Sequence, residues 1–404
     1  MNMEIRPILS ALLRNRAGAI LVALQIAITL AIVVNAVYVT QQRLVHIGRP
    51  SGMDDQNIFS FWVNTYEKDY DYFGMVNADM ALLRAMPGVV DAAPMSQMPL
   101  SGSGSATQFY TQPDKKGEKS PANYYLTDDH AVQTLGVKLS AGKTFNASDV
   151  EYKPTQEQSW APVAIISTGL AKALFKDEPA LGKTFYDDIG NPIRVVGVIE
   201  HMQGSWVGWD KVDRVMLTPR INPGGSTMYA IRSKPGEMDR LIADVEVALR
   251  KRDPNRVIAT PIKKMSDMKL ESYAGDSLMA VTLSTVTGLV LVFSALGIFG
   301  LATFNVSTRT RQIGTRRAVG ARKRDIVRYF MTENWLITTL GVVVGCCLAL
   351  AAGFWLSTQF QLPRLDLYYL IGGVLGLWLV GQLAAWQPSR KAAKVSPAMA
   401  TRTV

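Results

Sequence analysis

Residues 278–328 read LMAVTLSTVTGLVLVFSALGIFGLATF and then NVSTRTRQIGTRRAVGARKRDIVR. The first 27 of these residues carry no charge, and a helix of that length can cross about 30 Å of hydrocarbon at about 1.5 Å per residue. The last 20, residues 309–328, hold eight basic side chains and one acidic one. A long apolar helix that runs into an arginine-rich loop is typical of a membrane protein whose loop faces the cytoplasm.

Three further stretches without charged residues have comparable lengths: 17–42, 334–363 and 367–389. In lipid, a lone segment must satisfy its backbone hydrogen bonds within itself, which only a helix does. The chain is therefore predicted to have four transmembrane helices, with these bounds: 17–39, 277–306, 334–356 and 367–387. The sequence is 48% hydrophobic and 19% charged, which suits four such helices combined with one large aqueous domain.

The net charge of +10 is concentrated in three segments: 1–16, 307–333 and 388–404. The positive-inside rule places these segments in the cytoplasm, together with both termini, and places 40–276 on the periplasmic side of a bacterial inner membrane. The basic charge thus indicates orientation in the lipid bilayer, and we expect no nucleic-acid partner. The apolar core of 17–39 is longer than that of a secretory signal peptide, so we expect it to remain as an anchor.

Two segments of the aqueous domain share one pattern, 57–99 and 226–265. Each has strand-like alternation, then helical spacing of apolar residues, then a break at Pro87 or Pro254 and a second strand. Two β-α-β units commonly pack as one ferredoxin-like sheet with its helices on one face. The segment between them, 100–222, is rich in Gly, Pro and short apolar runs. The predicted fold is an α-helical membrane protein with a large α+β extracytoplasmic domain, in which a ferredoxin-like βαβ pair carries an inserted β-rich lobe.

Two features of the inserted lobe bear on its function. Residues 102–119 are polar and poor in apolar side chains, which predicts a surface loop. Two Gly-Lys-Thr triplets, at 142–144 and 182–184, are similar to the end of a phosphate-binding loop, but Val137 and Asp177 stand where its first glycine is needed. We therefore expect no ATP site in these residues, and we assign ATP and its Mg²⁺ to a partner protein.

Enzyme signatures are missing from the sequence. The three histidines are scattered at 46, 130 and 201, and no zinc-protease or serine-hydrolase motif occurs. The four predicted helices contain no Asp, Glu, Lys, Arg or His, whereas ion-coupled transporters need titratable groups at membrane depth. We expect no catalytic residue, cofactor or metal site in this chain.

The arginine-rich loop has a pattern that charge alone does not explain. Its segment 309–321 reads RTRQIGTRRAVGA, with apolar residues at intervals and Gly320 where a helix would end. This pattern resembles the signature of the FtsX-like permease family, although Gln312 stands where that family usually has an acidic residue. The segment 57–265 resembles the MacB-like periplasmic core domain. The candidates for ATPase coupling are Arg309, Arg311, Ile313, Gly314, Arg316, Arg317, Ala318, Gly320 and Ala321.

The resemblance implies the non-catalytic permease subunit of a type VII ABC transporter, a dimer that pairs with two copies of a cytoplasmic ABC ATPase. Closure of the ATPases would move the helix at 309–321. The first two transmembrane helices, extended as stalks over 38–45 and 265–276, would carry that motion to the periplasmic domain. The implied function is ATP-driven efflux of a drug, peptide or metabolite.

Other functions and partners stay open at this point. A permease of the same family can instead release lipoproteins or regulate a cell-wall hydrolase. A protein of a different class, a membrane-anchored sensor or assembly platform without ATP coupling, is also compatible with the sequence. The second permease of the dimer is either an identical or a related chain, and a periplasmic adaptor and an outer-membrane duct are further candidate partners.

Overall fold

The computed structural model describes residues 16–66, 70–153, 160–222, 224–360 and 364–396. The chain divides into two units. The helical unit contains the residues up to Ile47 and those from Asp276 onward, and the α/β unit is Gly48–Gly275. Four helices long and apolar enough to span a membrane, with one large α/β unit, confirm the predicted fold class.

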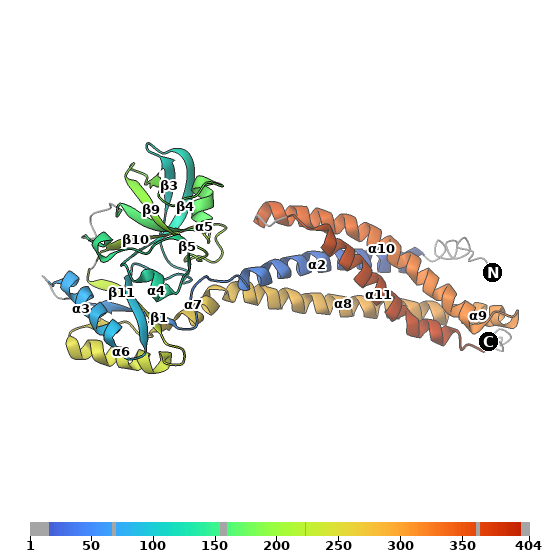
Figure 1. Ribbon diagram of the computed structural model, residues 1–404. Helices are drawn as coiled ribbons and strands as arrows, with labels where there is room; N and C mark the ends of the chain where they lie inside the picture. Colours follow the sequence, from blue (N-terminus) through green and yellow to red (C-terminus); the bar gives the residue numbers. More distant parts are fainter. Residues whose placement is uncertain (1–15, 67–69, 154–159, 223, 361–363, 397–404) are drawn as a thin grey trace. The chain divides into compact units, whose positions relative to one another are not determined.

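The helical unit contains four long helices (Figure 1): α2 (Arg16–Ile47), α8 (Ala274–Thr308), α10 (Lys323–Phe360) and α11 (Leu367–Ala392). Each extends beyond the segment predicted from hydropathy. The largest difference is in α10, which begins at Lys323 although its uncharged part starts only at Asn334. Charged residues end the part that can lie in lipid, but they are good helix formers and do not end a helix.

Small residues let α2 and α10 pack closely. A Cβ atom at Gly341 would lie 2.6 Å from the carbonyl oxygen of Ala23, and one at Gly345 would lie 2.9 Å from Cβ of Leu30. Glycine at such sites allows two helix backbones to approach in lipid, where van der Waals packing drives helix association. Helix α11 joins the same apolar core through Leu370 and Leu377.

Helix α8 is packed less extensively than its neighbours. Gln25 Nε2 donates to the carbonyl oxygen of Phe293 at 3.2 Å, which links α2 to the middle of α8. The buried residues of α8 are Ala280, Ser294, Ile298 and Asn305. Most of its remaining apolar surface is exposed within this chain.

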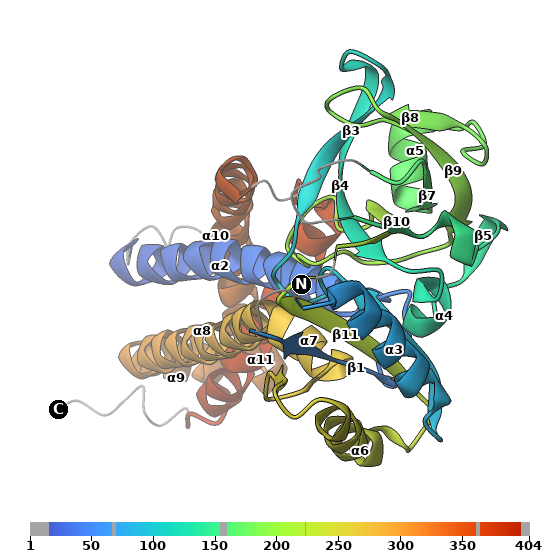
Figure 2. The ribbon, with the colours of Figure 1, turned by 90° about the vertical axis from the view of Figure 1, so that its left-hand side faces the viewer.

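The α/β unit contains the predicted pair of β-α-β units. The first consists of β1 (Ile58–Asn64), α3 (Tyr72–Ala85) and β2 (Val89–Met95), and the second of β11 (Ser226–Ser233), α6 (Met238–Arg252) and β12 (Val257–Ile258). The strands are ordered β12-β1-β11-β2, and each neighbouring pair is antiparallel. This order is that of a ferredoxin-like sheet, and Figure 2 shows its central strands β1 and β11 with α3 and α6. The short strand β13 (Lys263–Lys264) also pairs with β1.

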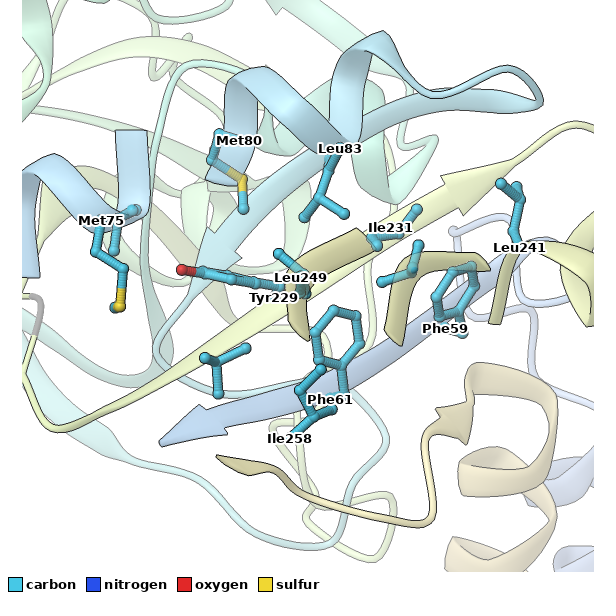
Figure 3. Close-up of a cluster of buried hydrophobic side chains, with 14 of the residues drawn as sticks. Phe59, Phe61, Met75, Met80, Leu83, Tyr229, Ile231, Leu241, Leu249 and Ile258 are labelled. Atoms are coloured by element: carbon cyan, nitrogen blue, oxygen red, sulfur yellow. The ribbon is translucent and has the colours of Figure 1, made fainter. Parts of the chain in front are cut away.

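Alternation along β1 separates the two faces of this sheet. Phe59, Phe61 and Val63 are buried in one core with Tyr229 and Ile231 of β11 and with apolar residues of α3 and α6 (Figure 3). A buried ion pair fixes the helices to the sheet. Arg256 Nη1 lies 2.7 Å from both carboxylate oxygens of Asp79, and Tyr229 Oη donates to the same carboxylate at 2.8 Å.

The inserted lobe is a ring of six strands, in the order β4 (Lys116–Thr127), β3 (Ala106–Gln112), β8 (Thr184–Tyr186), β9 (Pro192–Ile199), β7 (Val163–Ser167) and β10 (Val215–Ile221). Each strand pairs with the next, and β10 pairs with β4 to close the ring. Helix α5 (Thr168–Phe175) shares one apolar core with all six strands. The smaller elements of the lobe are α4 (Ala131–Leu135), β5 (Leu139–Gly142), the 3₁₀ turn Ala147–Asp149 and β6 (Glu151–Tyr152).

Two details differ from the sequence-based expectation. The segment 102–119 was expected to be a surface loop, but most of it forms β3 and the start of β4. Within 102–119 only Phe109 is buried, so the alternation of buried and exposed residues that marks a strand is missing there. The stalk predicted at 265–276 is also interrupted. Its first part is a separate helix, α7 (Met265–Ser272), which ends at Tyr273.

Candidate coupling site

A nine-residue helix, α9 (Thr310–Ala318), connects α8 to α10. Its end follows from one glycine. Gly320 has φ +104°, its N–H donates to the carbonyl of Arg317, and the N–H of Ala321 donates to the carbonyl of Arg316. These two bonds form a Schellman motif, which needs a left-handed residue that glycine adopts without strain. The chain therefore turns sharply into α10, where Asp325 accepts from the N–H of Arg322 at 2.9 Å.

The inner side of α9 is held by apolar contacts. Ile313 is only 4% exposed. It packs with Ile326 and Phe330 of α10 and with Ala392 and Ala393 at the end of α11. Consequently α9 lies against two other helices of the unit and is not a free loop.

An ion pair fixes the corner between α8 and α9. Arg309 Nη1 lies 3.0 Å from Glu333 Oε1 and 2.9 Å from Oε2. The side chains are 15% and 3% exposed. Since the charge of Glu333 is buried, its pairing with Arg309 avoids the cost of an isolated carboxylate. The contact joins the start of α9 to the third turn of α10.

Polar side chains gather around this ion pair. A small cavity of about 20 Å³, which has room for a single water molecule, is lined by residues of all four long helices, among them Val22, Asn305, Glu333, Asn334 and Ser389. Asn334 Nδ2 donates to the carbonyl of Gly381 in α11 at 3.0 Å. The carboxamide oxygen of Asn305 is buried without a hydrogen-bond partner. A water molecule in this cavity would give that oxygen a donor.

Two arginines of α9 contact the neighbouring segments. The guanidinium of Arg316 lies 4.6 Å from the ring centroid of Tyr329 in α10, a cation–π distance. Arg317 Nη1 donates to the carbonyl of Ala393 at 3.4 Å, while its Nε is buried without a partner. Both contacts hold the C-terminal half of α9 against its supports.

The outer side of α9 is exposed and basic. Arg311 and Arg316 are exposed there, and Val319 is an apolar side chain that is 84% exposed. The first residues of α10 continue the basic surface with Arg322, Lys323, Arg324 and Arg328, all exposed. A surface of this composition can bind an acidic partner around one apolar contact.

The nine predicted coupling residues thus divide into two sets. Five of them are buried or half-buried on the inner side: Arg309, Ile313, Gly314, Arg317 and Ala321. Four are exposed: Arg311, Arg316, Ala318 and Gly320. All nine lie in α9 or within three residues of its ends, and their role in coupling remains a prediction.

The sequence analysis did not predict the residues that contact the inner side of α9. Glu333 was placed in the loop but not among the site residues, although a carboxylate so close to many arginines was a usable signal. Tyr329, Phe330 and Ala392 had no such signal, because nothing in the sequence brings the end of α11 next to α9. Among the described residues, no group of three side chains could hold a metal ion.

Two family profiles cover most of the chain. Residues 18–260 match the MacB-like periplasmic core domain, and residues 284–397 match the FtsX-like permease C-terminal family. The chain belongs to the FtsX-like permeases with a MacB-like periplasmic core domain. The expected family is therefore confirmed, and α9 of this permease lies inside the FtsX-like match.

Several bacterial ABC transporter proteins are similar in sequence. The macrolide export ATP-binding/permease protein MacB of Marinobacter nauticus is 25% identical over 338 residues, which are 80% of this chain and 48% of that protein. The uncharacterized ABC transporter permease YknZ of Bacillus subtilis is 24% identical over 292 residues, 70% of this chain and 71% of that protein. The pyoverdine export ATP-binding/permease protein PvdT of Pseudomonas syringae pv. tomato is 25% identical over 324 residues, which are 75% of this chain and 45% of that protein. The chain spans about half the length of the MacB and PvdT proteins that it matches.

Two solved structures are similar to part of this permease at low sequence identity. The extracellular domain of the transporter YknZ from Gram-positive bacteria is 13% identical, covers 50% of this chain and 100% of that chain, and gives a TM-score of 0.33. The periplasmic region of MacB from Actinobacillus actinomycetemcomitans is 16% identical. The match covers 55% of this chain and 94% of that chain, with a TM-score of 0.34.

Proposed function

We propose that this chain is the permease of an ATP-driven type VII ABC transporter in a bacterial inner membrane. In this proposal the loop with α9 and both termini lie in the cytoplasm, and the α/β unit lies in the periplasm. An ABC ATPase dimer binds the outer side of α9 and hydrolyses ATP, while two permease chains form the membrane part. The observation that carries the proposal is the form of α9, which is fixed on its inner side and exposed and basic on its outer side.

The contacts of α9 allow it to transmit a push. Because Arg309 is bound to Glu333 and Ile313 is buried against α10 and α11, a displacement of α9 would move α8 and α10 together. Helix α8 has 35 residues and is about 50 Å long at about 1.5 Å per residue. Near its other end, Arg43 of α2 lies 2.9 Å from Asp276 of α8. Motion along α8 would therefore reach α2 at the point where both helices connect to the α/β unit.

We further propose that the transported molecule is a drug, peptide or metabolite that leaves the cell. The relatives named above include proteins for macrolide and pyoverdine export. The spans predicted from the sequence contain no Asp, Glu, Lys, Arg or His, so ATP would be the energy source. An adaptor and an outer-membrane duct are proposed as further partners on the periplasmic side.

A test of this function targets the outer side of α9. The double variant Arg311→Glu with Val319→Asp reverses one charge and replaces the exposed apolar side chain with a carboxylate. We expect it to lose co-purification with the ATPase and at least about tenfold of the permease-stimulated ATP hydrolysis, since both groups face outward. A loss of about 1.4 kcal/mol in binding would produce that factor.

The matched control is Lys391→Glu, which reverses an exposed basic residue near the end of α11. We expect this variant to bind and stimulate the ATPase as the unchanged chain does. If the double variant still co-purifies with the ATPase and still stimulates it, the outer side of α9 is not the docking surface.

A further inference from the structure

A cleft in the α/β unit shares no residue with the coupling site. It is on the face of the ferredoxin-like sheet that α3 and α6 do not cover, and its volume is about 570 Å³. Four segments surround it: strand β1 through Ser60 and Trp62, the loop 96–105, strand β11 through Met228, and the segment 259–268. This volume falls in the range of about 300–1,000 Å³ that is typical of small-molecule sites.

Trp62 is the exposed aromatic surface of the cleft. Its neighbours Phe61 and Val63 belong to the core with α3 and α6, so the alternation of β1 turns Trp62 to the opposite face. The side chain is 37% exposed. A half-exposed indole in a concave site offers a flat apolar surface for stacking.

Methionines form the deeper part of the cleft. Met98, Met228 and Met268 line it and are 1%, 9% and 4% exposed. Their unbranched thioether side chains adjust to different shapes and favour contact with aromatic rings. The apolar part of the cleft can therefore accommodate a ring system without a fixed outline.

Several polar side chains of the cleft are bonded within the protein, and no carboxylate is part of its described lining. Gln97 Nε2 donates to the carbonyl of Tyr124 at 2.7 Å, and Ser101 Oγ donates to the carbonyl of Met98 at 2.7 Å. Lys263, the charged residue in the described lining, is paired with Glu271 at 2.9 Å. A charged ligand would lose its hydration without gaining a free counter-charge. The lining thus favours an uncharged molecule.

The wall formed by the loop 96–105 is held in place without a ligand. Leu100 has φ +59°, a strained value for a residue with a branched side chain, and is fully buried. Its N–H donates to the carbonyl of Gly204 at 3.1 Å, and the N–H of Gly102 donates to the carbonyl of Ser205 at 2.9 Å. A cleft formed in advance requires little ordering when a ligand binds.

We propose that this cleft binds a small, uncharged, amphipathic molecule that places an aromatic or fused-ring face against Trp62. The proposal deepens the proposed function in one respect, because such a molecule would be of the class that the transporter exports. A second copy of the chain or a partner protein would instead have to enter a cleft whose apolar surface is mostly recessed.

The experiment is photo-labelling of the full chain in lipid nanodiscs with 4-(hydroxymethyl)benzophenone, an uncharged two-ring probe. Labelled peptides are identified by mass spectrometry over a range of probe concentrations. We expect saturable labelling of the peptides that carry Met98, Met228 or Met268. Trp62→Ala should raise the half-saturating concentration at least fivefold.

Two further variants separate binding from misfolding. Ser103→Trp fills the cleft from an exposed loop position and should reduce labelling at least fivefold. Tyr66→Ala removes a more exposed aromatic residue just beyond the end of the same strand, and labelling should stay within twofold of the unchanged chain. Thermal unfolding of each variant is measured in parallel, so that a folding defect is recognised.

Labelling that does not saturate, or that is equal in the unchanged chain and in Ser103→Trp, would overturn the proposal. Cross-links between two chains through the peptide of Trp62 would also overturn it, in favour of a second copy as the occupant. The labelling requires no ATPase. A failed transport assay would therefore count against the proposed function alone, and failed labelling against the cleft alone.

Discussion

Glu333 contributes to the coupling site through two contacts with a single guanidinium group. The carboxylate is 3% exposed, so its charge is stable there only because Arg309 neutralises it. Arg309 directly precedes α9, so its contact with Glu333 fixes the position at which the helix begins. Arg309 is therefore better understood as a positioning residue than as a contact for the ATPase.

Glu333→Gln is expected to lower the stability of the helical unit, because Arg309 would keep its charge in a largely buried place. Breaking such a pair costs about 3 kcal/mol, which thermal unfolding of the purified full chain would detect. Arg311→Gln removes an exposed charge from the same helix and serves as the control, with no loss expected. A normal melting temperature for Glu333→Gln, or no recovery in the exchanged pair Arg309→Glu with Glu333→Arg, would count against this role.

A second prediction concerns Asp128 in the α/β unit. Burial raises the pKa of this carboxyl to about 6, although Arg84 partly opposes the shift. The folded state then binds a proton that the unfolded state, with a pKa near 3.8, releases. The stabilisation from this group is complete below about pH 4 and is lost as the pH rises through about 6.

Asp128→Asn should therefore flatten the change in unfolding free energy between pH 4 and pH 6.5 by about 2 kcal/mol. The measurement is chemical unfolding of the full chain at a series of pH values. Asp188→Asn, at an exposed turn, should leave the pH profile as it is. An identical slope for Asp128→Asn and the unchanged chain would contradict the prediction.

Helices α2 and α10 depend on close backbone contact at Gly341. A methyl group there would meet the carbonyl oxygen of Ala23, which belongs to the backbone of α2 and cannot move independently of that helix. Gly341→Ala should therefore destabilise the helical unit by about 1–3 kcal/mol. Gly300→Ala in α8, where the new methyl group would meet no atom within 4 Å apart from its chain neighbours and the backbone of its own helix, should be neutral or stabilising by about 0.5–1 kcal/mol.

Thermal unfolding of the two glycine variants under the same conditions checks this prediction. The comparison is matched, since both substitutions add one methyl group to the interior of a long apolar helix. Equal melting temperatures would mean that α2 and α10 can separate at Gly341 without loss.

The elements differ in how well the sequence predicted them, for physical reasons. A helix that crosses the hydrocarbon of a bilayer needs about 20 apolar residues without charge, and this pattern made the four long helices recognisable in the sequence. Gly320 and the arginines around it likewise predicted α9 and its end. The outer part of the hairpin of β3 and β4, residues 106–119, is mostly polar and carries no such signal. The partners of Glu333 and Ile313 depend on tertiary packing, which no local pattern encodes.

In the helical unit, α9, the first turns of α2 and the end of α11 lie at the same end. The proposed orientation places this end in the cytoplasm. It can be tested in a chain whose Cys346 and Cys347 are replaced by alanine, with one new cysteine at Val319 or at Tyr66. Both positions are highly exposed.

A membrane-impermeant maleimide added to cells with a permeabilised outer membrane should label Tyr66→Cys and not Val319→Cys. Breaking the inner membrane should make Val319→Cys reactive as well, which controls for its accessibility. Labelling of Val319→Cys in cells with an intact inner membrane would place α9 in the periplasm and end the proposed mechanism.

Helix α8 buries few of its side chains against the rest of this chain. Where no other protein covers it, its neighbours are acyl chains, and these yield when the helix tilts or shifts. The resistance to such movement would then come from the bilayer more than from the protein. A transporter whose motion passes along such a helix should therefore work more slowly in ordered bilayers, cholesterol-rich or gel-phase, than in fluid bilayers, even when its ATPase is unchanged.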